Sequence, residues 1–327
     1  PDIASKHWIV RQYDHEVQGG SVIKPLVGLN QDGPSDGAVI RPKLSSQRGI
    51  AIASGIQTTI GENASPKYAD DGDSYWMALA CIDEAIRNVV CVGADAKRIA
   101  ILDNFCWPSC DEPQQLGSFV RAAEACYDGA LSYHTPFVSG KDSLNNQFTT
   151  DCGQVITIPP TLLITAVGVV SDVRQCLTMD AKAPGNILLL VGWTTPESGG
   201  SHYVRTTGDR SGNLRIPKVD LDAHPKAALA VADLIQQGLA RSAHDCSDGG
   251  LLVAAAEMAI AGRMGLQLEL KTICKQMEVT IHEACFSETP GRYLLEIESN
   301  HLAQTAAVLD SHHAPHFTVG TFADHGR

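Results

Sequence analysis

The chain has 327 residues, 44% of them hydrophobic and 19% charged, and its formal net charge is −12. That length suits two domains, and a core of that size needs no metal or disulfide staple. The acidic balance argues against non-specific binding to nucleic acid, which requires basic surface. No apolar run is long enough to cross a bilayer and no signal peptide is visible, so we expect a cytoplasmic protein without nucleic-acid or membrane partners.

The ten cysteines fit reduced thiols better than a secreted disulfide scaffold, because several of them lie inside apolar runs. Cys106 and Cys110 are four residues apart, but no second Cys or His pair with ligand spacing follows them. That spacing does not favour a zinc site. The chain opens at Pro1 without an initiator methionine, which suggests a piece of a longer protein.

In the N-terminal part, short apolar runs between turn residues predict strands, and two longer periodic stretches predict helices. The predicted strands are residues 7–10, 21–24, 38–41, 49–53, 99–102, 137–140 and 161–169. The predicted helices are residues 74–92, with Asp73 or Ser74 as N-cap, and residues 114–132.

A break is expected between residues 172 and 186, where Pro184-Gly185-Asn186 marks a turn. After it the patterns predict strands at 187–192, 266–270 and 293–298 and helices at 223–239 and 249–262. Strands and helices are mixed without strict βαβ repetition. We therefore predict an α+β fold of two domains, residues 1–178 and 179–327.

The predicted helix 74–92 has an apolar stripe that is interrupted by Glu84 and Asn88, four residues apart on one face. Asp83 and Arg87 are expected on the solvated face. A carboxylate on an inward stripe needs a partner, and Glu and Asn oxygens suit a hard cation such as Mg²⁺. The alternative is that Glu84 pairs with a basic residue or lies at an interface edge.

Residues 244–251 read His-Asp-Cys-Ser-Asp-Gly-Gly-Leu and lie just before a predicted helix. Glycines let backbone N–H groups approach a ligand, a helix N-terminus favours phosphate, and the acids could hold the accompanying cation. An N-cap with a turn is the equal alternative. A serine hydrolase is not favoured, because no G-x-S-x-G elbow occurs.

Two further segments are candidates for ligand contacts. Asp36 enters the predicted strand 38–41 directly from a turn and could supply a third metal-ligand oxygen, although such a residue is more often part of the turn. Residues 140–143, Gly-Lys-Asp-Ser, form a predicted loop after a strand. This loop lacks the spacing of a Walker P-loop, so phosphate contact and a surface turn are equal alternatives.

Taken together, five segments resemble, in their order, the second AIR-synthase-like half of phosphoribosylformylglycinamidine (FGAM) synthase. They are residues 13–19 (Tyr-Asp-His-Glu-Val-Gln-Gly), 36–39, 84–88, 140–143 and 244–251. The last segment is shared with AIR synthase, selenophosphate synthetase and thiamine-monophosphate kinase. The first segment and the Gly-Lys-Asp-Ser segment narrow the resemblance to FGAM synthase, and it extends over essentially the whole chain.

The resemblance implies a barrel-forming N-terminal domain and an α+β C-terminal domain that covers a nucleotide. It also implies a ligase that uses ATP and glutamine-derived ammonia to convert formylglycinamide ribonucleotide (FGAR) to FGAM in purine biosynthesis. In this half the nucleotide site would be auxiliary and hold ADP with Mg²⁺. The implied partners are the first AIR-synthase-like half, or a second copy joined through the barrel domain, and a glutaminase domain or subunit.

The resemblance also implies roles for individual residues. The Mg²⁺ ligands would be Asp36, Glu84, Asn88 and Asp245. The nucleotide would contact Lys6, Ser247, Asp248, Gly249 and Gly250. The substrate side of the cleft would include Gly19, Gly20 and Ser21. The family's catalytic His segment and its glutaminase Cys have no counterpart here, and segment 288–292 matches only loosely, so no catalytic residue is assigned and an isolated half is expected to be inactive.

Two alternatives stay open at this stage. The chain could be a stand-alone ATP-using enzyme of the same superfamily, either a cyclo-ligase or a small-molecule kinase. It could also be a non-catalytic nucleotide-binding scaffold that supports a partner.

Overall fold

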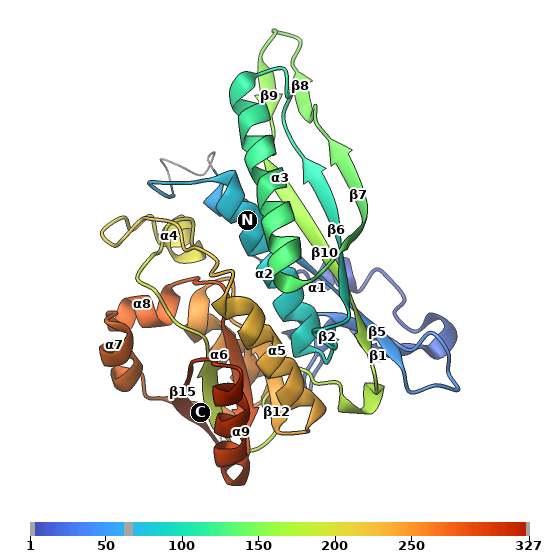
Figure 1. The fold of residues 1–327 in the computed structure, drawn as a ribbon, viewed down its shortest axis with the longest axis vertical. Helices are drawn as coiled ribbons and strands as arrows, with labels where there is room; N and C mark the ends of the chain where they lie inside the picture. Colours follow the sequence, from blue (N-terminus) through green and yellow to red (C-terminus); the bar gives the residue numbers. More distant parts are fainter. Residues whose placement is uncertain (1–3, 62–67, 325–327) are drawn as a thin grey trace.

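The computed structural model describes residues 4–61 and 68–324, which form two main β-sheets with helices packed against them (Figure 1). The first sheet has the strand order β1-β4-β5-β10-β6-β7, and the second has the order β12-β14-β11-β15-β13. Neighbouring strands run antiparallel, whereas β6 and β7 run parallel. The α+β class that the sequence predicts is confirmed.

The first sheet is covered by helices on one face. Its strands are β1 (Ser21–Ile23), β4 (Ala38–Ile40), β5 (Gly49–Ile56), β6 (Ile99–Cys106), β7 (Phe137–Ser143) and β10 (Thr161–Val170). Every second residue of β10 is buried, as expected for a strand with one covered face. Helix α2 (Ser74–Cys91) packs on β5 and β10, and α3 (Pro113–Tyr133) packs on α2.

The second sheet is buried mainly in its middle strands. Its strands are β11 (Ile187–Val191), β12 (Ala240–Asp245), β13 (Gly265–Leu268), β14 (Tyr293–Ile297) and β15 (His316–Ala323). All residues of β14 are buried, so both faces of this strand are covered. The longer helices of this part are α5 (Ala223–Gln236), α6 (Gly250–Gly262) and α9 (Leu302–Ser311).

Shorter elements complete the described part. The helices are α1 (His7–Val10), α4 (His202–Thr207), α7 (Lys271–Met277) and α8 (Ile281–Phe286). Two small hairpins pair β2 (Leu26–Val27) with β3 (Gly33–Pro34) and β8 (Gln147–Thr149) with β9 (Val155–Thr157). The domain boundary predicted after residue 178 falls between β10 and β11 and stays a prediction.

Helix α2 joins the two sheets, because it contacts β5 and β10 on one side and α5 and β12 on the other. Its predicted N-cap is confirmed: the Asp73 carboxylate accepts the Tyr75 N–H at 2.7 Å. The prediction that Asp83 and Arg87 lie on a solvated face is wrong. Their side chains are only 1% and 3% exposed, because the second sheet and its helices cover that face.

Three local predictions also need correction. Residues 7–10 form the short helix α1 rather than a strand, since a four-residue apolar run has no measurable period and its surroundings decide. Residues 140–143 are the end of strand β7, not a loop, and lie at one edge of the first sheet. His244 and Asp245 end strand β12, a strand that is absent from the predicted elements.

Candidate functional site

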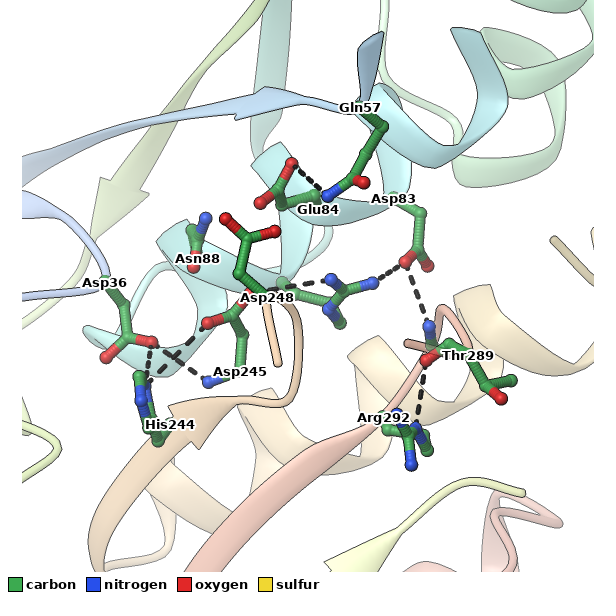
Figure 2. Close-up of polar contacts among 12 residues, drawn as sticks. Asp36, Gln57, Asp83, Glu84, Asn88, His244, Asp245, Asp248, Thr289 and Arg292 are labelled. Atoms are coloured by element: carbon green, nitrogen blue, oxygen red, sulfur yellow. Dashed lines mark hydrogen bonds and ion pairs between the residues drawn. The ribbon is translucent and has the colours of Figure 1, made fainter. Parts of the chain in front are cut away.

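Acidic and amide side chains from three distant segments meet between α2 and the connection from β12 to α6. Asp36 comes from the turn before β4, Glu84 and Asn88 from α2, and Asp245 from the end of β12. Figure 2 shows these side chains gathered in one region, with Asp248 among them. The structure therefore brings together all four residues that the sequence suggests as Mg²⁺ ligands.

Asp36 is buried and holds the end of β12 in place. Its Oδ1 accepts the backbone N–H of Asp245 at 2.9 Å and lies 2.7 Å from Nδ1 of His244. Burial raises the pKa of Asp36, although the charge of His244 opposes this. The other oxygen, Oδ2, is buried and has no hydrogen-bond partner among the described residues. Ligand atoms of Asp36, His244 and Asp245 lie within 4.8 Å of one another.

Glu84 and Asn88 are fixed by the backbone of β5 and the turn that follows it. Glu84 Oε2 accepts the N–H of Ile56 at 2.7 Å and the side-chain amide of Gln57 at 3.2 Å. Asn88 Nδ2 donates to the carbonyl of Ser54 at 3.1 Å, which leaves Asn88 Oδ1 buried and without a partner in the described part of the chain.

This environment suits a hard cation. Burial raises the pKa of Glu84 well above its ordinary value, and the nearby charges of Asp245 and Asp248 raise it further. A divalent cation would offset that repulsion. It would also supply the missing partner for the unpaired oxygens of Asp36 and Asn88, which are of the kind that Mg²⁺ prefers. The residues present thus fit a Mg²⁺ ion.

Arg87 positions one member of this group and was missed as a site residue because it was placed on the solvated face. Its guanidinium forms an ion pair with Asp83 and lies 3.4 Å from Oδ2 of Asp245. Asp83 in turn accepts the hydroxyl of Tyr133 at 2.6 Å and the N–H of Gly291 at 2.9 Å. This buried network links α2 to both β12 and the loop before β14.

The glycines of the β12–α6 connection allow the backbone to approach its neighbours closely. Gly249 and Gly250 have φ values of +82° and +74°, a region that L side chains rarely adopt. A Cβ on Gly250 would lie 2.7 Å from the carbonyl oxygen of Ser287. These two positions therefore require glycine for local structural reasons, independently of any ligand.

A cavity of about 460 Å³ lies beside the start of α6. Lys6, Asp248 and Gly249, which the resemblance assigns to the nucleotide, all line it. Tyr203 and Phe286 add aromatic walls. Ser247 lines a smaller neighbouring hollow together with Arg87 and Glu288. The suggested nucleotide contacts thus lie around one end of α6.

The structure places other suggested residues elsewhere. Gly20 and Ser21 line a separate hollow with Arg41, whose N–H donates to the Gly20 carbonyl at 2.7 Å, and Gly19 ends the turn before β1. Residues 140–143 lie on β7, where a Cβ on Gly140 would lie 2.4 Å from an Asp103 oxygen. Among the residues that the structure describes, no cysteine belongs to a group of potential metal ligands.

Glu288 and His202 were not expected at the site. Glu288 Oε1 accepts the backbone N–H groups of Gly249 and His202, each at 2.7 Å. Together with Asp248 they form a second group of potential ligands within 4.8 Å. Segment 288–292 was noticed in the sequence, but only the fold shows that it reaches the start of α6.

Across the described residues, no helix combines the length and apolarity needed to cross a membrane.

Known proteins resemble the chain along most of its length. The model of the AIR synthase related protein N-terminal domain matches residues 34–170, and that of the C-terminal domain matches residues 183–327. The phosphoribosylformylglycinamidine synthase subunit PurL of Alkaliphilus metalliredigens is 36% identical over 322 residues, 98% of this chain and 39% of that protein. The subunit of the same name from Deinococcus radiodurans is 34% identical over 326 residues, with coverages of 98% and 40%.

Among solved structures, T. maritima PurL complexed with FGAR matches with a TM-score of 0.70 at 19% identity, covering 92% of this chain and 45% of that one. The same T. maritima protein has been solved with ATP and with ADP. This chain spans about two fifths of the length of the curated relatives it matches. Because both of its domains match in order, the chain belongs to the AIR synthase related family, and its relatives there include PurL subunits of phosphoribosylformylglycinamidine synthase.

Proposed function

We propose that this chain binds a magnesium–nucleotide at the junction of α2, β12 and α6. The observation that carries the proposal is the convergence of Asp36, Glu84, Asn88 and Asp245, two of which keep buried oxygens without a partner among the described residues. Such oxygens are costly unless a ligand satisfies them. The complexes of T. maritima PurL with ATP and ADP support a nucleotide as the bound molecule.

In this proposal each residue has a stated task. Asp36, Glu84, Asn88 and Asp245 hold the Mg²⁺ ion, which neutralises phosphate charge when bound. Lys6, at the rim of the cavity, supplies a positive charge to the phosphates. Ser247, Asp248, Gly249 and Gly250 shape the start of α6, whose N–H groups favour an anion. Arg87 keeps Asp245 oriented while no cation is present.

We further propose that the chain is one part of an FGAM synthase, a ligase that makes FGAM from FGAR, ATP and glutamine-derived ammonia in the cytoplasm. The PurL relatives and the FGAR complex of T. maritima PurL support this assignment. The chain would hold the auxiliary MgADP site, and the catalytic His and the glutaminase would belong to other parts of the enzyme. Gly19, Gly20 and Ser21 would contribute to the FGAR side of the cleft.

The partner in this proposal is the first AIR-synthase-like half, which would complete a barrel with the first sheet. The face of that sheet opposite α2 supports such a partner. It exposes Ile40, Ile52 and Ile56, which lie on one side of β4 and β5. An apolar sheet face in water is typical of an interaction surface.

Isothermal titration calorimetry with MgADP tests the nucleotide site. Glu84→Gln and Asp245→Asn each remove one anionic oxygen and should weaken MgADP binding on the order of tenfold or more, while binding of ADP with a chelator changes little. Glu269→Gln is the matched control, because that carboxylate accepts the backbone N–H of Lys271, the first residue of α7, at the surface. Unchanged MgADP affinity in both site variants, with the fold intact, would remove the metal site.

A further inference from the structure

Glu288 occupies backbone donors that a phosphate would otherwise find free. Its side chain is 9% exposed, and a single oxygen, Oε1, accepts the N–H groups of both His202 and Gly249 at 2.7 Å. His202 is the first residue of α4, and Gly249 is the N-cap of α6. Donors at helix starts have no acceptor within their own helix. The Glu288 carboxylate is therefore an internal anion placed where two helices begin.

The surroundings keep this carboxylate in place. The buried guanidinium of Arg292 donates to the carbonyl of Thr289 at 2.9 Å and to that of Ser287, which are the two neighbours of Glu288 in the chain. Its third bond goes to the hydroxyl of Thr194 at 2.9 Å. With both flanking carbonyls fixed by one buried side chain, the loop has little freedom to withdraw Glu288.

Glu288 also lies beside the proposed phosphate contacts. It lines one hollow together with Ser247, and it bonds directly to Gly249, which lines the 460 Å³ cavity with Lys6 and Asp248. A phosphate that reached the start of α6 would therefore find the Gly249 N–H already in use and would meet the negative charge of Glu288. The His202 imidazole, whose Nδ1 lies 3.3 Å from Glu288 Oε1, offsets that charge only when it is protonated. Each further phosphate group on a nucleotide increases that repulsion.

We propose that Glu288 is a specificity-determining residue that makes this site prefer a nucleoside diphosphate to a nucleoside triphosphate. The inference rests on the proposed magnesium–nucleotide function and adds the reason for its selectivity. Glu288 acts in two ways: it occupies two N–H donors, and it repels the additional charge that a terminal phosphate brings. The site then holds a diphosphate without presenting free donors for a third phosphate.

The test compares calorimetric Kd values for MgADP and for the non-hydrolysable triphosphate analogue MgAMPPCP. Glu288→Gln removes the charge but keeps an oxygen that accepts both N–H groups, so the fold should survive. We expect the ratio of triphosphate to diphosphate Kd to fall on the order of tenfold, about the effect of one charge interaction at a protein surface. Glu288→Ala, which also frees the two donors, should lower the ratio at least as far.

Glu283→Gln is the matched control, because Glu283 also accepts a backbone N–H, that of Thr280 at 2.7 Å, yet lines neither cavity. Its Kd ratio should equal that of the unmodified chain. An unchanged ratio in both Glu288 variants, with both nucleotides still binding, would reduce Glu288 to a structural clamp and overturn this inference alone. An unmodified chain that binds neither nucleotide would overturn the proposed function and this inference together.

Discussion

Replacing Arg87 by methionine should strongly destabilise the fold, because it breaks a buried charge network between the two sheets. Arg87 is 3% exposed, and its partners Asp83 and Asp245 are 1% and 6% exposed. Asp83 would keep the hydrogen bonds from Tyr133 and Gly291, but neither carboxylate would keep the nearby guanidinium charge. Removing one partner of a buried ion pair costs about 3–5 kcal/mol.

Urea unfolding of Arg87→Met measures this cost, with Lys226→Met as control. Lys226 forms an ion pair with Asp222 at 2.7 Å on the surface of α5, and loss of an exposed pair of this kind costs under about 1 kcal/mol. MgADP should restore part of the lost stability in Arg87→Met, because the proposed cation would compensate Asp245. If both variants lose the same small amount of stability, the buried network does not hold α2 to β12.

Three further predictions address the glycine turn, the ligand and the activity. Gly250→Ala should destabilise the folded chain by about 1–3 kcal/mol or more in thermal unfolding, because this position combines a positive φ with a close contact to the Ser287 carbonyl. The control Gly208→Ala, with a φ of +71° and open space around it, should cost only the backbone strain. Equal losses of stability in the two variants would exclude a contribution from the contact. MgADP at a hundredfold excess over Kd should stabilise the chain by about 2.7 kcal/mol and raise Tm by roughly 4 °C, whereas ADP with a chelator should raise Tm much less. Equal rises in Tm with and without Mg²⁺ would argue against a bridging cation. The chain alone, given ATP, Mg²⁺, FGAR and ammonium, should form no FGAM above background, because positioning across two halves supplies most of phosphoryl-transfer catalysis. Adding the first AIR-synthase-like half should restore some turnover. Sustained FGAM formation by the isolated chain would contradict the half-enzyme proposal.

Much of the fold was predictable because its longest elements have clear periods. The strand predicted at residues 161–169 and the start of α2 at Asp73 follow directly from local sequence. Glu84 and Asn88 could be singled out because they interrupt an apolar stripe. Grouping them with Asp36 and Asp245 required the family resemblance, since these residues are up to 209 positions apart and no local pattern connects them.

The remaining features depend on tertiary contacts that local sequence does not encode. Arg87 and Asp83 look like a surface i,i+4 pair, and only the packing of α5 and β12 against α2 buries them. No local pattern marks Glu288, and its contact with Gly249 arises because the loop before β14 passes the start of α6. Strand β12 has a largely polar sequence and is defined by its pairing with β14.

Diffraction from crystals grown with ADP and Mn²⁺ tests the central claim most directly. Mn²⁺ prefers the same oxygen ligands as Mg²⁺, and its anomalous signal locates it without reference to the protein coordinates. We predict a peak within coordination distance of the two unpaired oxygens, Asp36 Oδ2 and Asn88 Oδ1, with the ADP phosphates between this ion and the start of α6. Bound ADP with no peak at these oxygens, or a peak at another site, would contradict the account.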